Sequence, residues 1–147
     1  MLNKSLCFML ALLLIFCCAC SSDSSMKRYT YDDFSYNAPS SWAADVSDPD
    51  VIFMQYSNKE EKTITVSKYD SSLFDDLDSD NIDYEVSDCE LKSGITLHGA
   101  IYENEDGYLV AIYPFDASSG DQYRITFIQK DFDPDFVVDT LNSVEIK

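Results

Sequence analysis

The sequence is poor in several residue types, and each shortage excludes a class of protein. Its 147 residues include one histidine, four glycines and four prolines. One histidine cannot form a multi-histidine metal site, and no glycine-rich loop of the kind that cradles phosphates is present. Glycine and proline are also too sparse for a low-complexity linker. We therefore expect one small folded domain without a resident cofactor.

Positive charge is scarce as well. Lysine and arginine together number 10, aspartate and glutamate 27, and the formal net charge is -17. Nucleic-acid-binding proteins carry clustered positive charge, so this balance argues against a nucleic-acid partner. It also disfavours lying flat on an anionic membrane. We expect the acidic surface to keep the domain soluble, or to meet a basic partner or cations.

Cysteine is concentrated at one end of the chain. Four of the five cysteines fall within the first 20 residues, and only Cys89 lies beyond them. The same segment has a basic residue, Lys4, an apolar run over residues 6–16 and then small residues, which is the organisation of a secretory signal. The apolar run is shorter than the roughly 20 residues that a membrane-spanning helix needs. These features predict a signal that is cleaved or processed.

The segment resembles the bacterial lipoprotein signal, in which a small residue precedes a cysteine that is lipidated and begins the mature chain. Ala19 and Cys20 fit these positions; Cys18 is the alternative acceptor, and cleavage without a lipid is the other alternative. The resemblance implies a signal peptide over residues 1–19, a lipid on Cys20 with a short tether to residue 28, and anchoring to the extracytoplasmic side of a bacterial cell membrane. Two acyl chains hold a protein far more stably than one.

After the tether, apolar and polar side chains alternate, and this pattern predicts strands. Turn residues such as Ser93-Gly94 and Asp106-Gly107 separate the runs. The run over residues 108–115 is apolar on both faces, which is typical of a strand covered on each side. The expected strands are residues 50–56, 62–69, 84–92, 95–103, 108–115 and 122–129.

Two helices fit between and after these strands. One should follow Asp133, whose side chain can accept a hydrogen bond from the first turn, with Pro134 at the first helical position. Val137, Leu141 and Val144 form its apolar stripe. A shorter helix is expected over residues 72–77. Residues 29–147 are thus predicted to form a single α+β domain, an antiparallel sheet with one or two helices packed on it. With Cys89 as its lone cysteine, this domain must fold without an internal disulfide.

Two segments of the domain resemble PsbP-like domains. FSYNAPSSW, residues 34–42, is similar to their opening strand and turn, and DFVVDTLNSVEI, residues 135–146, to their closing helix and strand. The resemblance implies a PsbP-like fold and a tendency to bind proteins, and it transfers no catalytic residues.

Three residue groups could carry chemistry. A two-residue Ser93-Gly94 turn would place Cys89 opposite His98 on neighbouring strands, where the imidazole could activate the thiol of a hydrolase. The alternative is a buried structural cysteine and an unrelated histidine. This alternative is favoured because a one-residue slip in register moves the two side chains to opposite faces.

The acidic run around residue 80 raises the question of a metal. Asp76, Asp78 and Asp80 match the first three ligand positions of a calcium loop. However, Asn81 stands where that loop needs glycine, and Ser87 where it needs glutamate. An exposed acidic connection is the favoured interpretation, and no metal site is predicted beyond these three weak candidates.

Aromatic residues offer a third possibility, since exposed rings can bind proteins or glycans. Most should instead pack the sheet, and Trp42 is expected to close one end of the core. The sequence thus favours a non-enzymatic lipoprotein, held at the membrane by its lipid, whose domain binds an envelope protein. The alternative is a module for glycan or a divalent cation. The tyrosines considered for exposure are Tyr29, Tyr31, Tyr36, Tyr56, Tyr102 and Tyr108.

Overall fold

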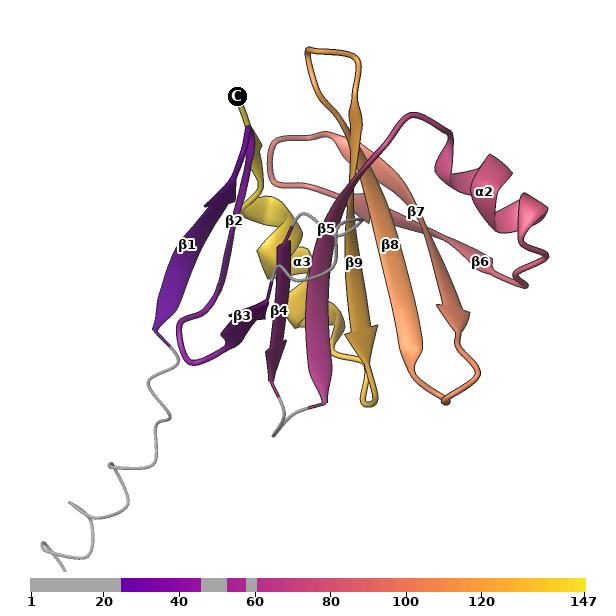
Figure 1. Cartoon of the computed structure of the whole chain (residues 1–147), viewed down its shortest axis with the longest axis horizontal. Coiled ribbons are helices and arrows are strands. Elements are labelled where there is room, and N and C mark those ends of the chain that lie inside the picture. The colour runs from indigo at the N-terminus through magenta and orange to yellow at the C-terminus, as the bar shows by residue number, and fades with distance from the viewer. Residues whose placement is uncertain (1–24, 46–52, 58–60) are drawn as a thin grey trace, which may run out of the picture.

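The structure is a computed structural model that describes residues 25–45, 53–57 and 61–147 (Figure 1). The signal segment and the candidate lipid-attachment residue Cys20 lie outside the described residues. The helices and strands are β1 Met26–Tyr31, β2 Phe34–Pro39, β3 Ala43–Asp45, β4 Phe53–Ser57, β5 Lys62–Tyr69, α2 Leu73–Ser79, β6 Glu85–Glu90, β7 Thr96–Glu103, β8 Leu109–Asp116, β9 Gln122–Gln129, α3 Pro134–Asn142 and β10 Glu145–Ile146.

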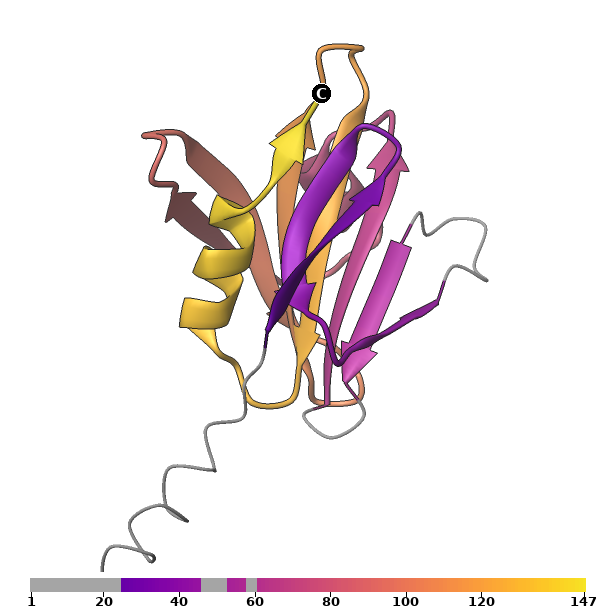
Figure 2. The ribbon, with the colours of Figure 1, turned by 90° about the vertical axis from the view of Figure 1, so that its left-hand side faces the viewer.

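The strands form two antiparallel sheets. The larger has the order β3-β4-β5-β9-β8-β7-β6, and the smaller has the order β1-β2-β10. Helix α3 and the small sheet cover one face of the large sheet, and α2 lies against the other face (Figures 1 and 2). The predicted α+β class, an antiparallel sheet with helices packed on it, is confirmed. No helix in the described part of the chain is long and apolar enough to cross a membrane.

The main core lies between the large sheet and the layer made by α3 and the small sheet. Strand β9, in the middle of the large sheet, contributes Ile125 and Phe127, which are fully buried. Phe34 of β2 and Leu141 of α3 meet them from the opposite layer. Trp42 is buried in the same cluster, with its ring centroid 5.4 Å from that of Phe136. Its predicted role as a core residue is confirmed.

A second, smaller core lies on the other face of the large sheet. There Leu73 and Leu77 of α2 pack with Ala100 of β7 and with the partly buried Ile112 of β8. Because Ala111 of β8 belongs to the main core, β8 has apolar contacts on both faces, as its sequence predicts.

Both helices begin close to the predicted positions. The side chain of Asp133 accepts a hydrogen bond from the backbone N–H of Phe136 at 3.1 Å, and Pro134 is the first residue of α3. This cap and the Lys62 ammonium, 3.1 Å from the Asp133 carboxylate, hold the pKa of that carboxyl below its usual range. The short helix α2 extends two residues beyond the predicted end.

The first strand, β1, was not expected. Residues 26–28, expected from the sequence to belong to the tether, pair with β2 as the start of β1. Nearly all of the β1 side chains are exposed, and without a buried alternating face the strand has no sequence signature. Arg28 ties it to the domain by an ion pair to Glu145 at 2.7 Å and a hydrogen bond to the Ser35 hydroxyl at 2.9 Å.

Candidate functional site

The structure separates Cys89 from His98. Cys89 lies opposite Leu97, and His98 lies opposite Asp88. The reason is the turn between β6 and β7: the Leu91 N–H donates to the Ile95 carbonyl at 2.8 Å, so the turn that this pair closes has three residues, 92–94, and not two, with Gly94 at φ 84°. The predicted register was therefore wrong by one residue, and the thiol and the imidazole point to opposite faces of the sheet.

Neither residue has the environment of a catalytic group. Cys89 is buried in the main core, and burial raises the pKa of its thiol, so the thiol stays protonated near neutral pH. His98 is exposed, and its Nδ1 lies 2.9 Å from the Asp88 carboxylate across the strand pair. The two residues do not form a nucleophile and base.

We expect Cys89 to react slowly in the folded protein. Because its pKa is raised and its side chain is shielded, alkylation by iodoacetamide at pH 8 should be at least about tenfold slower than after unfolding in urea. The measurement is the rate at which mass spectrometry detects the alkylated form of the peptide that contains Cys89, in folded and unfolded samples. Equal rates would show that the thiol is accessible, contrary to its placement.

The three candidate metal ligands do not converge. Asp76 and Asp78 lie two residues apart on α2, so their side chains leave the helix in different directions. The carboxylate of Asp76 is paired with Arg124 at 2.7 Å, Asp78 accepts a hydrogen bond from Tyr84 at 3.1 Å, and Asp80 is the C-cap. In residues 25–45, 53–57 and 61–147, no cluster of three or more metal-ligating side chains occurs. The residues with calcium-loop spacing thus lie on helix α2 and at its C-terminal end, and they do not form a calcium-binding loop.

A groove runs between the edge strand β6 and α3. Its volume is about 260 Å³, and its walls are mainly apolar. The C-terminal end of α3 is fixed beside the β6–β7 loop, because the Asn142 side chain accepts a hydrogen bond from the Lys92 N–H at 2.7 Å. The side chains that make the groove apolar are Cys89, Ile101, Tyr113, Phe132, Val137 and Val138.

The strand that borders this groove has an open edge. Among the described residues, β6 pairs with β7 alone and ends the large sheet (Figure 1). Hydrogen-bonded and non-hydrogen-bonded pairs alternate in an antiparallel ladder, and the Leu91–Ile95 pair is hydrogen-bonded. The backbone groups of Val86, Asp88 and Glu90 therefore point away from β7. Sequence reasoning could not find this edge, because strand order depends on which distant segments pair.

A second cavity, of about 340 Å³, lies between α2 and the opposite face of the large sheet. Arg124 of β9 lines it, and the side chain is only 5% exposed. The guanidinium carbon lies 3.7 Å above the centre of the Tyr69 ring, and Asp76 neutralises the charge. Hydrogen bonds from Ser71 and then Arg124 hold the pKa of Asp76 below its usual range. The signal in the sequence was one arginine inside an otherwise uncharged strand, QYRITFIQ.

Comparisons with known proteins give information about the fold alone. No family model matches the sequence, and no curated protein matches it. Among solved structures, a crystal structure of a protein from Bacteroides thetaiotaomicron VPI-5482 is similar, with a TM-score of 0.57 and 14% sequence identity. The match covers 82% of this chain and 48% of that protein, so the chain spans about half the length of its neighbour.

Proposed function

We propose that this chain is a bacterial lipoprotein, anchored through Cys20, whose domain binds an extended segment of another envelope protein along β6. The observation that carries the proposal is the open edge of β6 beside an apolar groove. A bound segment would add a strand to the sheet and place alternate side chains in the groove, which is a common way for domains to recognise peptides. Contact, and not turnover, is the proposed activity, and the separation of Cys89 from His98 removes one catalytic alternative.

The backbone of β6 and the groove supply different parts of this recognition. Outward-pointing N–H and C=O groups of Val86, Asp88 and Glu90 can bond to any extended backbone, which gives affinity without sequence preference. The groove selects the side chain, because Val137, Tyr113 and their neighbours form an apolar wall. We therefore expect an apolar anchor residue in the bound segment.

The charge of the surface around β6 further restricts the kind of segment that can bind there. The exposed side chains of β6 include Glu85, Asp88 and Glu90, and α3 presents Asp135 and Asp139. Lys92 is the nearby basic exception. An acidic rim attracts basic segments and repels acidic ones, so the bound segment should carry lysine or arginine on either side of its apolar anchor.

The lipid anchor supports binding of a partner in the envelope. Tethering confines both proteins to the same surface and raises their effective concentration, so that a modest intrinsic affinity is enough. The resemblance to PsbP-like domains, a family with protein-binding members, supports the same conclusion.

A position-specific photo-crosslink tests the proposal. A benzophenone amino acid at Val86, which is 65% exposed on the open edge, should yield a covalent adduct with one envelope protein on intact cells. The same probe at Tyr31, 42% exposed on β1, is the matched control and should not yield that adduct. The crosslinked peptide should contain an apolar residue flanked by basic ones. Equal adducts from both positions, or no adduct from Val86, would remove the support for binding at β6.

The anchor itself makes a separate prediction. Cys20→Ser should abolish incorporation of a fatty-acid analogue and should move the protein from the membrane to the soluble fraction, or leave an unprocessed precursor, because the thioether can no longer form. Cys18→Ser is the matched control and should leave labelling intact. Labelling that persists in Cys20→Ser would assign the lipid to another residue.

A further inference from the structure

The buried guanidinium of Arg124 has unused hydrogen-bonding capacity. Its Nη2 donates to the Asp76 carboxylate at 2.7 Å and to the Ser71 carbonyl at 2.9 Å, and its Nε donates to the Gln122 side chain at 3.3 Å. The two N–H groups on Nη1 have no hydrogen-bond partner among the described residues. Nη1 is not among the buried polar atoms that lack a partner, so it is accessible from the cavity, where it can donate to a ligand acceptor or to water.

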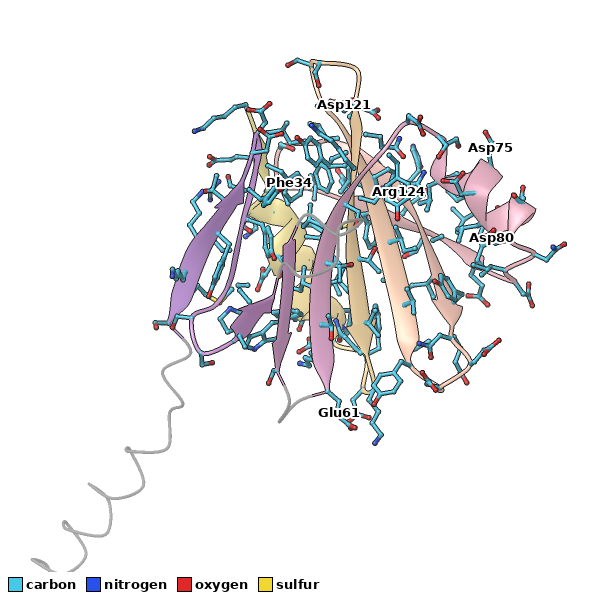
Figure 3. The ribbon with its side chains drawn as sticks, viewed as in Figure 1. Phe34, Glu61, Asp75, Asp80, Asp121 and Arg124 are labelled. Atoms are coloured by element: carbon cyan, nitrogen blue, oxygen red, sulfur yellow. The ribbon has the colours of Figure 1, made fainter. Side chains whose placement is uncertain are left out.

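The cavity around Arg124 combines rings with carboxylates. Tyr69, 40% exposed, stacks with the guanidinium, and Tyr102 of β7 also lines the cavity. Burial, and then the nearby Tyr69 and Asp80, raise the pKa of Tyr102, which keeps its hydroxyl protonated and able to donate. Asp80, at the end of α2, is exposed and has no ion pair among the described residues, so it is an available acceptor (Figure 3).

The charges of the cavity restrict the chemistry of its ligand. Asp76 already neutralises Arg124, and Asp80 adds a negative charge, so an anion is disfavoured. A metal ion is disfavoured because no cluster of ligating side chains occurs in the described part of the chain. What remains is a neutral molecule that both donates and accepts hydrogen bonds and has an apolar face for a tyrosine ring.

We propose that this cavity binds a neutral saccharide unit, with sugar hydroxyls accepting from Arg124 and donating to Asp80 and the sugar ring packed on the face of Tyr69 that the guanidinium does not cover. A volume of about 340 Å³ falls at the lower end of the range for small-molecule sites and suits one or two sugar rings. The cavity lies on the α2 face of the sheet, and the β6 groove lies on the α3 face. Saccharide binding is therefore independent of the proposed protein binding.

Saturation-transfer NMR on the full chain in amine-oxide detergent micelles tests this proposal. The probes are methyl glucoside, N-acetylglucosamine and maltose, each at about 10 mM because single sugar sites are weak, with acetate as the anionic comparison. At least one sugar should receive saturation from the wild type. That signal should fall at least about fivefold in Tyr69→Ala, because the stacking surface is lost. Tyr31→Ala, a tyrosine of similar exposure on β1, should leave it unchanged.

A second variant covers the case in which Tyr69→Ala disturbs the packing of Arg124. Asp80→Asn keeps the size of an exposed side chain and removes only the carboxylate, so it should weaken the same sugar signal. The proposal is overturned if no sugar receives saturation, if acetate binds and the sugars do not, or if both variants retain the wild-type signal.

Discussion

Replacing Phe127 with alanine should lower the free energy of unfolding by about 3–5 kcal/mol. The side chain is fully buried on β9, the middle strand of the large sheet, and its ring lies edge-on to Phe136 with centroids 6.2 Å apart. Truncation removes apolar contacts and leaves a cavity that the surrounding strands cannot close. Since small domains are stable by about 5–15 kcal/mol, a large part of the total would be lost.

Urea unfolding of residues 25–147, followed by the fluorescence of Trp42, measures this loss. Val138→Ala is the control: it removes two methyl groups from an exposed position of α3 and should cost less than about 1 kcal/mol. A Phe127→Ala variant as stable as this control would contradict the placement of β9 at the centre of the core.

Replacing Arg124 with methionine should lower the free energy of unfolding by about 2 kcal/mol at pH 7, through loss of its hydrogen bonds to charged and neutral acceptors. The ion pair with Asp76 also makes this difference depend on pH. The pKa of the Asp76 carboxyl is lower in the folded protein than in the unfolded protein. The ion pair therefore adds to the free energy of unfolding at pH values above the unfolded pKa, and this contribution is lost as the pH falls through the folded pKa.

The difference in the free energy of unfolding between wild type and Arg124→Met should therefore become smaller as the pH is lowered from 7 to about 3. Urea unfolding at several pH values measures this difference, and Asp76→Asn should reduce the same pH dependence while Asp75→Asn, exposed on the same helix, should not. A difference that is constant over this range would mean that the Asp76–Arg124 pair is not formed in solution.

The parts of this fold that sequence predicted are those governed by neighbours along the chain. Alternation identified the strand Lys62–Tyr69, and an acidic cap followed by proline identified the start of α3 at Pro134. These signals depend on residues within one turn or one strand, so they do not depend on which distant segments of the chain pair with each other. Strand β1 was missed because it has no buried face, and its pairing with β2 is what orders it.

The candidate sites depend on placements that no local pattern contains. One extra loop residue, made possible by Gly94, moved Cys89 away from His98 and removed the only catalytic hypothesis. The open edge exists because β6 ends the sheet, and the second cavity exists because β9 brings Arg124 beneath α2. Both follow from pairing between distant segments, which composition and periodicity do not specify.

The central claim, binding of an extended segment along β6, is tested most directly by Asp88→Pro beside Asp88→Ala. Proline removes an outward-pointing backbone N–H and is tolerated on edge strands, whereas alanine removes the same side chain and keeps the N–H. The recovery of the crosslinked envelope protein should be at least about tenfold lower with proline than with alanine, because both variants lose the carboxylate and only proline loses the backbone N–H that carries the affinity. Equal recovery from both variants would contradict strand addition at β6.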